Sequence, residues 1–575
     1  MTTTVDRAAV VARPRGSRVA VSAADASVAA VLLAYAVSAL VIPTLANVAV
    51  TDDWVYYRSV ETLLLEHRLQ VHDMSSAALV FQLLWGAAFA AVFGLSFGVL
   101  RVSTLVLVGL SGLAFYRLAR ALDIPCGWSA VGLAAYLFHP LGLSLAYTFM
   151  TDPHYVALLV IASWLYVRGL REGRTRPAWV LAASAGTACA TLVRQQGVLV
   201  PGGVLLALLL GGRLAPLARG VRLVLLVAGL PAVAAVGFMT WLRFGPGTPW
   251  ALDLFWRELG QAGVNGVVGL LPRLGVIEAI YFGFFVLPIA LAAVAAVRPT
   301  RLGGWVLAAG LIWTAVVSLG ALSYWFDGQK TMPYVGQFVS PTGIGPEDLI
   351  AARPILLDQT QRVGLTVGCA LASILVGWIV LARLSETHEF FGSSAGIVTG
   401  IALSQLAGTV PPSVHFIGWG GTLDRYLLPL LPFALLALLW TVGRARLLLP
   451  LAWLPVLAMA AWSVAGTRDH LAWLNGVWSI AQEANALGIP DTRLDAGAGW
   501  DGFHLYVSPP GRPSRSLDPP WWADLFAPST DSSYIVAGEH LPGYPVVLER
   551  SYWSWLHQRA LPLYLLRRPG IDGPP

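Results

Sequence analysis

Residues 27–58 read SVAAVLLAYAVSALVIPTLANVAVTDDWVYYR, a long apolar run followed by the acidic pair Asp52-Asp53. An apolar run of about 20 residues can cross the hydrocarbon core of a bilayer as a helix. This run is too long for the core of a signal peptide and has no convincing cleavage site, so it is interpreted as a retained first span. Arginines in residues 1–26 predict a cytoplasmic N-terminal tail, which puts the acidic pair on the outer side.

The composition is typical of a multi-pass membrane protein. Of the 575 residues, 57% are hydrophobic and 12% are charged, which excludes a soluble enzyme, and the 23 Trp, 17 Tyr and 21 Phe exclude a disordered chain. The net charge of +6 comes without a basic stripe interleaved with aromatics, so no nucleic-acid partner is expected. The three cysteines lie in or beside apolar segments and form no CxxC motif. Low Lys with abundant Arg and Ala is typical of a GC-rich bacterium.

Twelve further apolar segments follow the first, which predicts an all-α fold with about thirteen transmembrane helices between residues 27 and 466. In this threading the arginines of the short hairpins fall on the cytoplasmic side. The odd count puts residues 467–575 outside the cytoplasm, where turn and short-strand patterns predict a small α/β domain. The predicted spans are 27–48, 102–120, 127–149, 154–168, 178–193, 196–212, 222–243, 275–297, 303–323, 362–383, 393–410, 426–442 and 446–466.

One apolar segment, 77–99, does not fit this threading. Counted as a crossing, it would invert every Arg-rich hairpin after it, so we predict an interfacial helix within a first outer loop of residues 49–101. A fourteenth crossing is the alternative. Two further outer loops, 244–274 and 324–361, are expected from their content of Gly, Pro and aromatic residues.

Three aspartates at the outer ends of predicted spans are candidates for chemistry: Asp52, Asp53 and Asp152. An ionised acid near hydrocarbon persists only with a partner or a task such as proton abstraction. Helix capping would also explain Asp52, and Asp152 before Pro153, but it does not explain two acids at matched depth on one side. The neighbouring His154 either donates a hydrogen bond to an anionic ligand or is an ordinary interfacial residue.

Two arginines are predicted on the same outer side, against the positive-inside trend. Arg194 lies in LVRQQG, residues 192–197, and Arg425 in LDRYLLP, residues 423–429. The planar guanidinium fork suits a phosphate or pyrophosphate. Pairing of Arg425 with the adjacent Asp424, or of either arginine with lipid headgroups, is the structural alternative. Acids and arginines together indicate an outer cavity for an anionic lipid-linked donor and an acceptor hydroxyl.

These motifs resemble the C-type (GT-C) membrane glycosyltransferases, and within them glycosyltransferase family 39, the branch of the protein O-mannosyltransferases and the lipid A aminoarabinose transferases. The run Asp52-Asp53-Trp54-Val55-Tyr56 is similar to the family pattern D-E-x-x-Y, Asp152 to an Asp of the second outer loop, and residues 425–429 to a late Arg-Tyr-x-x-Pro element. Two elements depart from the family: residues 194–197 read RQQG where a Lys-Gly pair is common, and no Pro-Pro pair lies near Ser75.

The resemblance implies an inverting glycosyltransferase of the EC 2.4 type in the inner (plasma) membrane. It would move a sugar from a polyprenyl-phosphate donor to a hydroxyl of a glycan, lipid or protein acceptor on the extracytoplasmic face. Asp52 would be the base, with Asp53 and Asp152 beside it. The donor phosphate would be bound by Arg194, Arg425, Tyr56, His154 and Gln195.

Two matters stay open at this point. Members of the superfamily differ in metal dependence, and a divalent cation such as Mg²⁺ or Mn²⁺, if used, would bind Asp52, Asp53 and Asp152. The alternative function is a secondary transporter or lipid flippase in which the same aspartates are ion sites. A third hypothesis is that the protein is a catalytically inactive scaffold of an envelope assembly complex.

Overall fold

The computed structural model describes residues 23–171, 174–294, 303–326, 330–351, 353–385, 390–415, 422–442, 449–510, 520–528 and 530–571. The expected cytoplasmic tail lies largely outside the described residues. The same holds for Arg298, Arg301, Arg444 and Arg446, four of the arginines on which the predicted sidedness depends.

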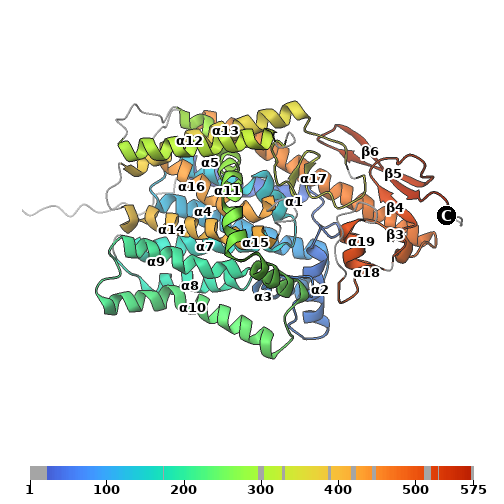
Figure 1. The fold of residues 1–575 in the computed structure, drawn as a ribbon, viewed down its shortest axis with the longest axis horizontal. Coiled ribbons are helices and arrows are strands. Elements are labelled where there is room, and N and C mark those ends of the chain that lie inside the picture. The colour runs from blue at the N-terminus through green and yellow to red at the C-terminus, as the bar shows by residue number, and fades with distance from the viewer. Residues whose placement is uncertain are drawn as a thin grey trace, which may run out of the picture.

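Most of the described chain is helical, and the long helices pack into one bundle (Figure 1). Nine of the described helices are long and apolar enough to cross a membrane, or ten if the pair α5–α6, bent by 59°, counts as one span. The chain is therefore a multi-pass membrane protein. These helices are α4 (Phe97–Ala121), α5 (Cys126–Leu137) with α6 (Pro140–Ala146), α7 (Thr151–Leu170), α10 (Leu217–Phe244), α11 (Trp250–Val294), α12 (Gly304–Phe326), α13 (Gln359–Ser385), α14 (Ser394–Gly408) with α15 (Val410–His415), η5 (Asp424–Leu430) with α16 (Leu431–Val442), and α17 (Leu449–Ala486).

The predicted count of thirteen spans is not reached by these helices. The other three predicted spans fall on shorter helices: α1 (Ala23–Val41), α8 (Pro177–Thr191), and η2 (Gln195–Leu199) with α9 (Val200–Leu210). Each predicted segment thus coincides with helix, but the crossing of these three stays a prediction. The segment 77–99 forms α3 (Val80–Phe93), whose 14 residues fall short of the roughly 20 that a straight crossing needs. Its interfacial position also stays a prediction.

The outer loop expected at 244–274 is helical over most of its length, because α11 begins at Trp250 and runs for 45 residues with a kink; its outer position stays a prediction. Its Gly and Pro residues suggested a loop. Gly263 instead makes a single kink, with φ 56° and ψ −168°, a conformation that favours glycine. Pro272 is tolerated inside the helix, as prolines often are in packed membrane helices. The other expected loop, 324–361, holds a small hairpin of β1 (Val339–Ser340) and β2 (Gly343–Ile344) before α13.

The C-terminal part forms a small mixed sheet at one end of the bundle (Figure 1). Its strand order is β3-β4-β6-β5, with β3 and β4 parallel and the other neighbours antiparallel. The helix α17 runs through the domain boundary predicted between residues 466 and 467, so the bundle and the sheet share one continuous helix. The elements are β3 (Leu494–Asp495), α18 (Ala498–Leu505), α19 (Trp521–Phe526), β4 (Tyr534–Ala537), β5 (Val546–Ser554) and β6 (Arg559–Arg567).

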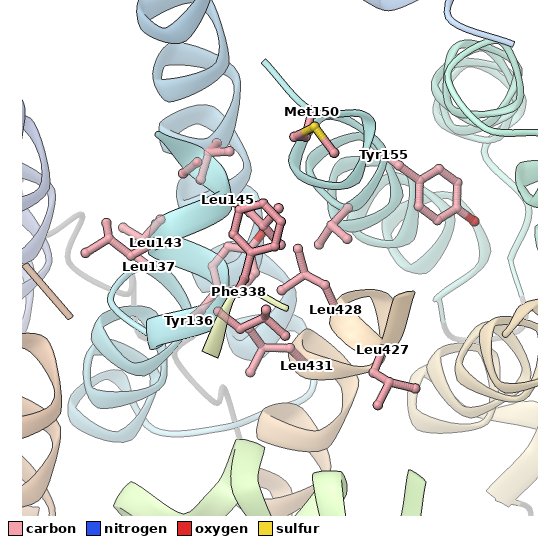
Figure 2. Close-up of a cluster of buried hydrophobic side chains, with 14 of the residues drawn as sticks. Tyr136, Leu137, Leu143, Leu145, Met150, Tyr155, Phe338, Leu427, Leu428 and Leu431 are labelled. Carbon is pink, nitrogen blue, oxygen red and sulfur yellow. The ribbon is translucent and has the colours of Figure 1, made fainter. Parts of the chain in front are cut away.

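The start of α7 is held in the core beside η5. Figure 2 shows Leu428 of η5 near Phe338 of the loop between α12 and α13, and Met150 and Tyr155 at the beginning of α7, which contacts η5. All four side chains are buried. Close packing of this kind leaves little freedom for the backbone. Residues at the beginnings of α7 and η5 are therefore fixed relative to one another, and these beginnings carry the acids and arginines singled out above.

Candidate functional site

Asp52 directly precedes α2 (Asp53–Leu65), and its side chain pairs with an arginine. Arg425 Nη1 donates a hydrogen bond to Asp52 Oδ2 at 3.0 Å. Among the described residues, no side-chain hydrogen bond caps α2, so the capping alternative for Asp52 is not what the structure has. The Asp52 side chain is 33% exposed and that of Arg425 is 8% exposed. The carboxylate is thus the accessible member of the pair.

Asp152 lies in the first turn of α7 and forms the second ion pair. Arg194 Nη1 donates to Asp152 Oδ1 at 2.5 Å, and the carboxyl is fully buried. The other carboxylate oxygen, Oδ2, is buried with no hydrogen-bond partner in the described part of the chain. Because a hydrogen bond between two charged groups is stronger than one between neutral groups, Asp152 holds the Arg194 guanidinium in a fixed direction.

The two ion pairs converge on two tyrosines. The guanidinium carbons of Arg194 and Arg425 lie 5.1 and 5.2 Å from the centroid of the Tyr426 ring, within the range of cation–π attraction. Tyr56, in α2, is buried within the fields of both carboxylates and both guanidinium groups. Burial, and then the Asp52 charge, raise the pKa of the Tyr56 phenol above its ordinary value. Residues from α2, α7, η5 and the segment before η2 thereby form one charged site.

Asp424 anchors the arginine-bearing η5 and does not pair with its neighbour. Its carboxylate accepts the backbone N–H groups of Phe338 and Val339, each at 2.9 Å, and is fully buried. The predicted alternative, an Asp424–Arg425 pair, is therefore wrong, because the two adjacent side chains serve different partners. Asp424 fixes the position from which Arg425 reaches Asp52.

Asp53 joins the start of α2 to the chain before α7. Its Oδ1 accepts the N–H of Phe149 at 3.0 Å and its Oδ2 the N–H of Val50 at 3.4 Å. The side chain is almost fully buried, and burial raises its pKa to about 7 against the opposing Arg101 charge. Because Asp52 and Asp152 each lie within three residues of these contacts, Asp53 sets the spacing of the two ion pairs.

Two of the predicted donor-binding residues have other partners. His154 Nδ1 bonds the carbonyl of Met150 at 2.8 Å, and its Nε2 lies 3.5 Å from the Thr104 hydroxyl. Gln195 Nε2 donates to the carbonyl of Ser76 at 3.0 Å. Their part in donor binding stays a prediction that these contacts do not favour.

The carboxylates do not fit a divalent cation as they are arranged. Asp52 and Asp152 are each neutralised by an arginine, and Asp53 is occupied by backbone N–H groups. Within the described ranges no group of three or more His, Cys, Asp or Glu side chains could hold a metal ion. A cation such as Mg²⁺ needs several free oxygen ligands.

Asp348 belongs beside this site and was missed by the sequence analysis. It lies in the loop between α12 and α13, where the Thr51 hydroxyl and the Asp52 charge act on its carboxyl, and burial raises its pKa to about 6. Tyr426 was seen only as part of a motif. Hydropathy and local motifs hold no signal for the approach of Asp348 to Thr51 or of Tyr426 to Arg194, because these partners are far apart in the chain.

A large apolar cavity borders the end of η5. It has a volume of about 1190 Å³ and lies between α11, α12, α13, α14 and α16. Its lining includes Phe282, Trp313 and Leu430, the last being the final residue of η5. The same short helix thus carries Arg425 and borders the cavity.

Fold and site together define a multi-pass membrane protein in which one short helix, η5, carries part of a charged site and borders a large apolar cavity. No protein-family model matches the chain, and no curated protein matches it. Among solved structures, the chain is similar to ArnT from Cupriavidus metallidurans bound to undecaprenyl phosphate, with 15% identity, 96% of this chain and 99% of that chain covered, and a TM-score of 0.37.

Two further solved structures are similar at comparable levels. The archaeal oligosaccharyltransferase AglB from Archaeoglobus fulgidus, in complex with an inhibitory peptide and a dolichol-phosphate, has 12% identity, 80% and 54% coverage and a TM-score of 0.36. The arabinosyltransferase EmbB from Mycobacterium smegmatis has 14% identity, 84% and 45% coverage and a TM-score of 0.33. Similarities this low establish no activity, so the chemistry has to be argued from the side chains.

Proposed function

We propose that this chain is a membrane glycosyltransferase that moves a sugar from a polyprenyl-phosphate donor to an acceptor hydroxyl on the extracytoplasmic face of the inner (plasma) membrane. One observation carries the proposal: the Asp52–Arg425 and Asp152–Arg194 pairs meet at Tyr426, and η5, which carries Arg425 and Tyr426, borders an apolar cavity of about 1190 Å³. A lipid phosphate needs cations for its headgroup and an apolar path for its tail. The arginines and the apolar cavity are both connected to η5.

The arginines are suited to hold the donor phosphate. A phosphate bound to Arg425 would compete with Asp52 for the guanidinium fork, which offers several donors. Donor binding would thereby release the Asp52 carboxylate, which is the more exposed member of the pair. The base would become free only when a donor is in place.

The released Asp52 would then act on the acceptor. It takes the proton of the acceptor hydroxyl while the acceptor oxygen attacks the anomeric carbon from the side opposite the phosphate. The bond from that carbon to the phosphate oxygen breaks, its electron pair stays on the phosphate, and the configuration inverts. Arg194 and Arg425 offset the growing negative charge on the phosphate. Asp152 and Asp53 keep these groups in position.

The positions of the acids favour this function over the alternative. A secondary transporter or flippase carries its ionisable groups near the bilayer midplane. Asp52 instead precedes α2, and Asp152 lies in the first turn of α7. The identity of the sugar, and whether the acceptor is a glycan, a lipid or a protein, are the finer parts of the proposal.

The decisive experiment uses the full chain in lipid nanodiscs with a panel of radiolabelled polyprenyl-phosphate sugars and an envelope extract as acceptor. Asp52→Asn is expected to abolish transfer while the protein still binds the donor. Glu66→Gln is the matched control, because Glu66 lies in the same predicted outer loop and pairs with Arg68 at the surface. Full transfer by Asp52→Asn would overturn the mechanism. Proton-coupled uptake by the wild-type chain in liposomes, without product, would favour the transporter.

Sidedness is tested separately in a variant in which the three native cysteines are replaced by Ala. An impermeant thiol reagent is expected to label Glu66→Cys in intact cells, and Arg176→Cys only after permeabilisation, since both positions are exposed in the structure. The reverse pattern would place the site in the cytoplasm, where the proposed extracytoplasmic transfer could not occur.

A further inference from the structure

A small second cavity borders Thr51, the residue before Asp52, and residues of the C-terminal domain. It has a volume of about 20 Å³, and its lining includes Thr51, Asp348, His470, Trp473 and Trp500. These residues come from the turn before α2, the loop between α12 and α13, and the helices α17 and α18. The cavity is therefore lined by residues near the charged site, residues of the bundle and residues of the C-terminal domain.

Three buried polar atoms of the lining residues have no hydrogen-bond partner among the described residues. They are Oδ2 of Asp348, Nε2 of His470 and Nε1 of Trp473. Buried polar groups are nearly always hydrogen-bonded, and an ordered water often supplies the missing partner. One water needs at least roughly 10–15 Å³ and two to four polar partners. The volume and the three atoms meet both requirements.

The hydrogen-bonding capacities also match. The backbone carbonyl of Pro346 accepts from the His470 ring, which leaves Nε2 of the neutral ring as an acceptor. Trp473 Nε1 can only donate, and an ionised Asp348 can only accept. A water therefore donates to Asp348 and to His470 and accepts from Trp473, so every group is satisfied at once.

The water would hold Asp348 at a defined place beside the charged site. The groups that act on the Asp348 carboxyl are Thr51, Asp52, Arg425 and Glu347, and His470 lies across the cavity. The backbone carbonyl of Asp348 also accepts the N–H of Ala498, which ties the loop to α18 of the C-terminal domain. Both the main chain and the side chain of Asp348 are thereby fixed.

We propose that this cavity binds one ordered water and that Asp348, fixed by it, is a positioning residue for Asp52. The inference rests on the proposed function, in which Asp52 takes a proton from the acceptor. An ionised Asp348 places a negative charge near Asp52 and so favours movement of a proton to Asp52. Protonation of Asp348 removes that charge. The protonated carboxyl would also donate a hydrogen bond to the water, although the water has to donate to this carboxyl in the proposed arrangement.

The water site is tested without any activity measurement. Infrared spectra of the full chain in nanodiscs are taken as the pH is lowered through the range in which Asp348 titrates. Asp53 also titrates near this range, so the band of Asp348 is identified as the protonated-carboxyl signal that the wild type and Glu539→Gln show and that Asp348→Asn lacks; Glu539 is an exposed acid of the C-terminal domain. Trp473→Phe removes the donor to the water and is expected to shift that band. An unshifted band in Trp473→Phe would overturn the water bridge.

The role in positioning is tested by the pH profile of transfer. Asp348→Asn resembles the protonated residue, so it is expected to be several-fold slower than the wild type at neutral pH and above. The two rates are expected to converge as the pH falls below about 6. A constant ratio over the whole range would overturn the positioning role. If the wild type transfers no sugar at any pH, the proposed function fails, whereas the infrared experiment still decides the water site.

Discussion

Arg425 donates a hydrogen bond at 3.0 Å to Asp52, a residue 373 positions earlier in the chain. This contact joins η5 to the start of α2 and brings a proposed phosphate ligand and a proposed base into one pair. Since the same guanidinium cannot fully serve a carboxylate and a phosphate, donor binding and release of the base are coupled by geometry. This coupling can be tested by substitution of Arg425 or of Asp52.

Arg425→Lys keeps the positive charge but removes the planar fork. We expect the affinity for a radiolabelled polyprenyl phosphate to fall about tenfold, the equivalent of roughly 1.4 kcal/mol, because an ammonium cannot bind the phosphate in a bidentate manner. Equilibrium binding in nanodiscs measures the change. Arg550→Lys, in the surface pair with Glu483, is the control and is expected to bind normally. Unchanged affinity in Arg425→Lys would remove Arg425 from the donor site.

Asp152→Asn leaves the Arg194 guanidinium without its carboxylate in a largely buried position. Breaking one member of a buried pair typically costs about 3–5 kcal/mol, so a clear drop in the unfolding temperature is expected. Combining it with Arg194→Gln is expected to recover part of the loss, since the uncompensated charge is then gone. Thermal unfolding followed by tryptophan fluorescence in detergent tests both. Strictly additive losses would mean that the pair is not coupled.

The raised pKa of Asp53 predicts that the free energy of unfolding depends on pH. Burial raises its pKa from the ordinary 3.8 to about 7 in the folded chain. The folded state then binds the proton more tightly than the unfolded state, so this residue's contribution to the free energy of unfolding is largest at low pH. It declines as the pH rises from about 4 to about 7, by on the order of 4 kcal/mol, and is constant above that.

Asp53→Asn, which cannot ionise, is expected to flatten this part of the profile of unfolding temperature against pH. Asp348, with a pKa raised to about 6, contributes a smaller slope of the same sign that the variant retains. Glu66→Gln, on the surface, is expected to leave the whole profile unchanged. An unaltered slope in Asp53→Asn would show that the buried carboxyl does not titrate in this range.

The apolar cavity predicts a dependence on the length of the lipid. Ala402→Phe places a ring in the cavity, so it is expected to weaken binding of a full-length polyprenyl phosphate several-fold, while a water-soluble phosphate with one short prenyl unit binds as before. Competition binding with the two lipids gives the comparison. Leu210→Phe, at an exposed end of α9, is the control. Equal losses for both lipids would indicate a general defect of the site.

Much of the architecture could be read from local patterns. Every predicted span coincides with helix, because an apolar run in a bilayer has to satisfy its backbone hydrogen bonds within itself. The small C-terminal sheet was predicted from strand and turn residues, and its presence is confirmed. The helix within the expected outer loop 244–274 was not foreseen, because Gly and Pro break isolated helices more readily than packed ones.

The sequence by itself determined the membrane class, the helices, and which acids and arginines stand out, since these depend on composition and short spacing. Only the tertiary structure decided the partners. Arg425 meets Asp52 instead of its neighbour Asp424, Asp53 is a buried link to Phe149, and Asp348 joins the site from a distant loop. Ion pairs form where packing brings side chains within a few ångströms, and the packing of helices far apart in the chain is a property of the whole fold.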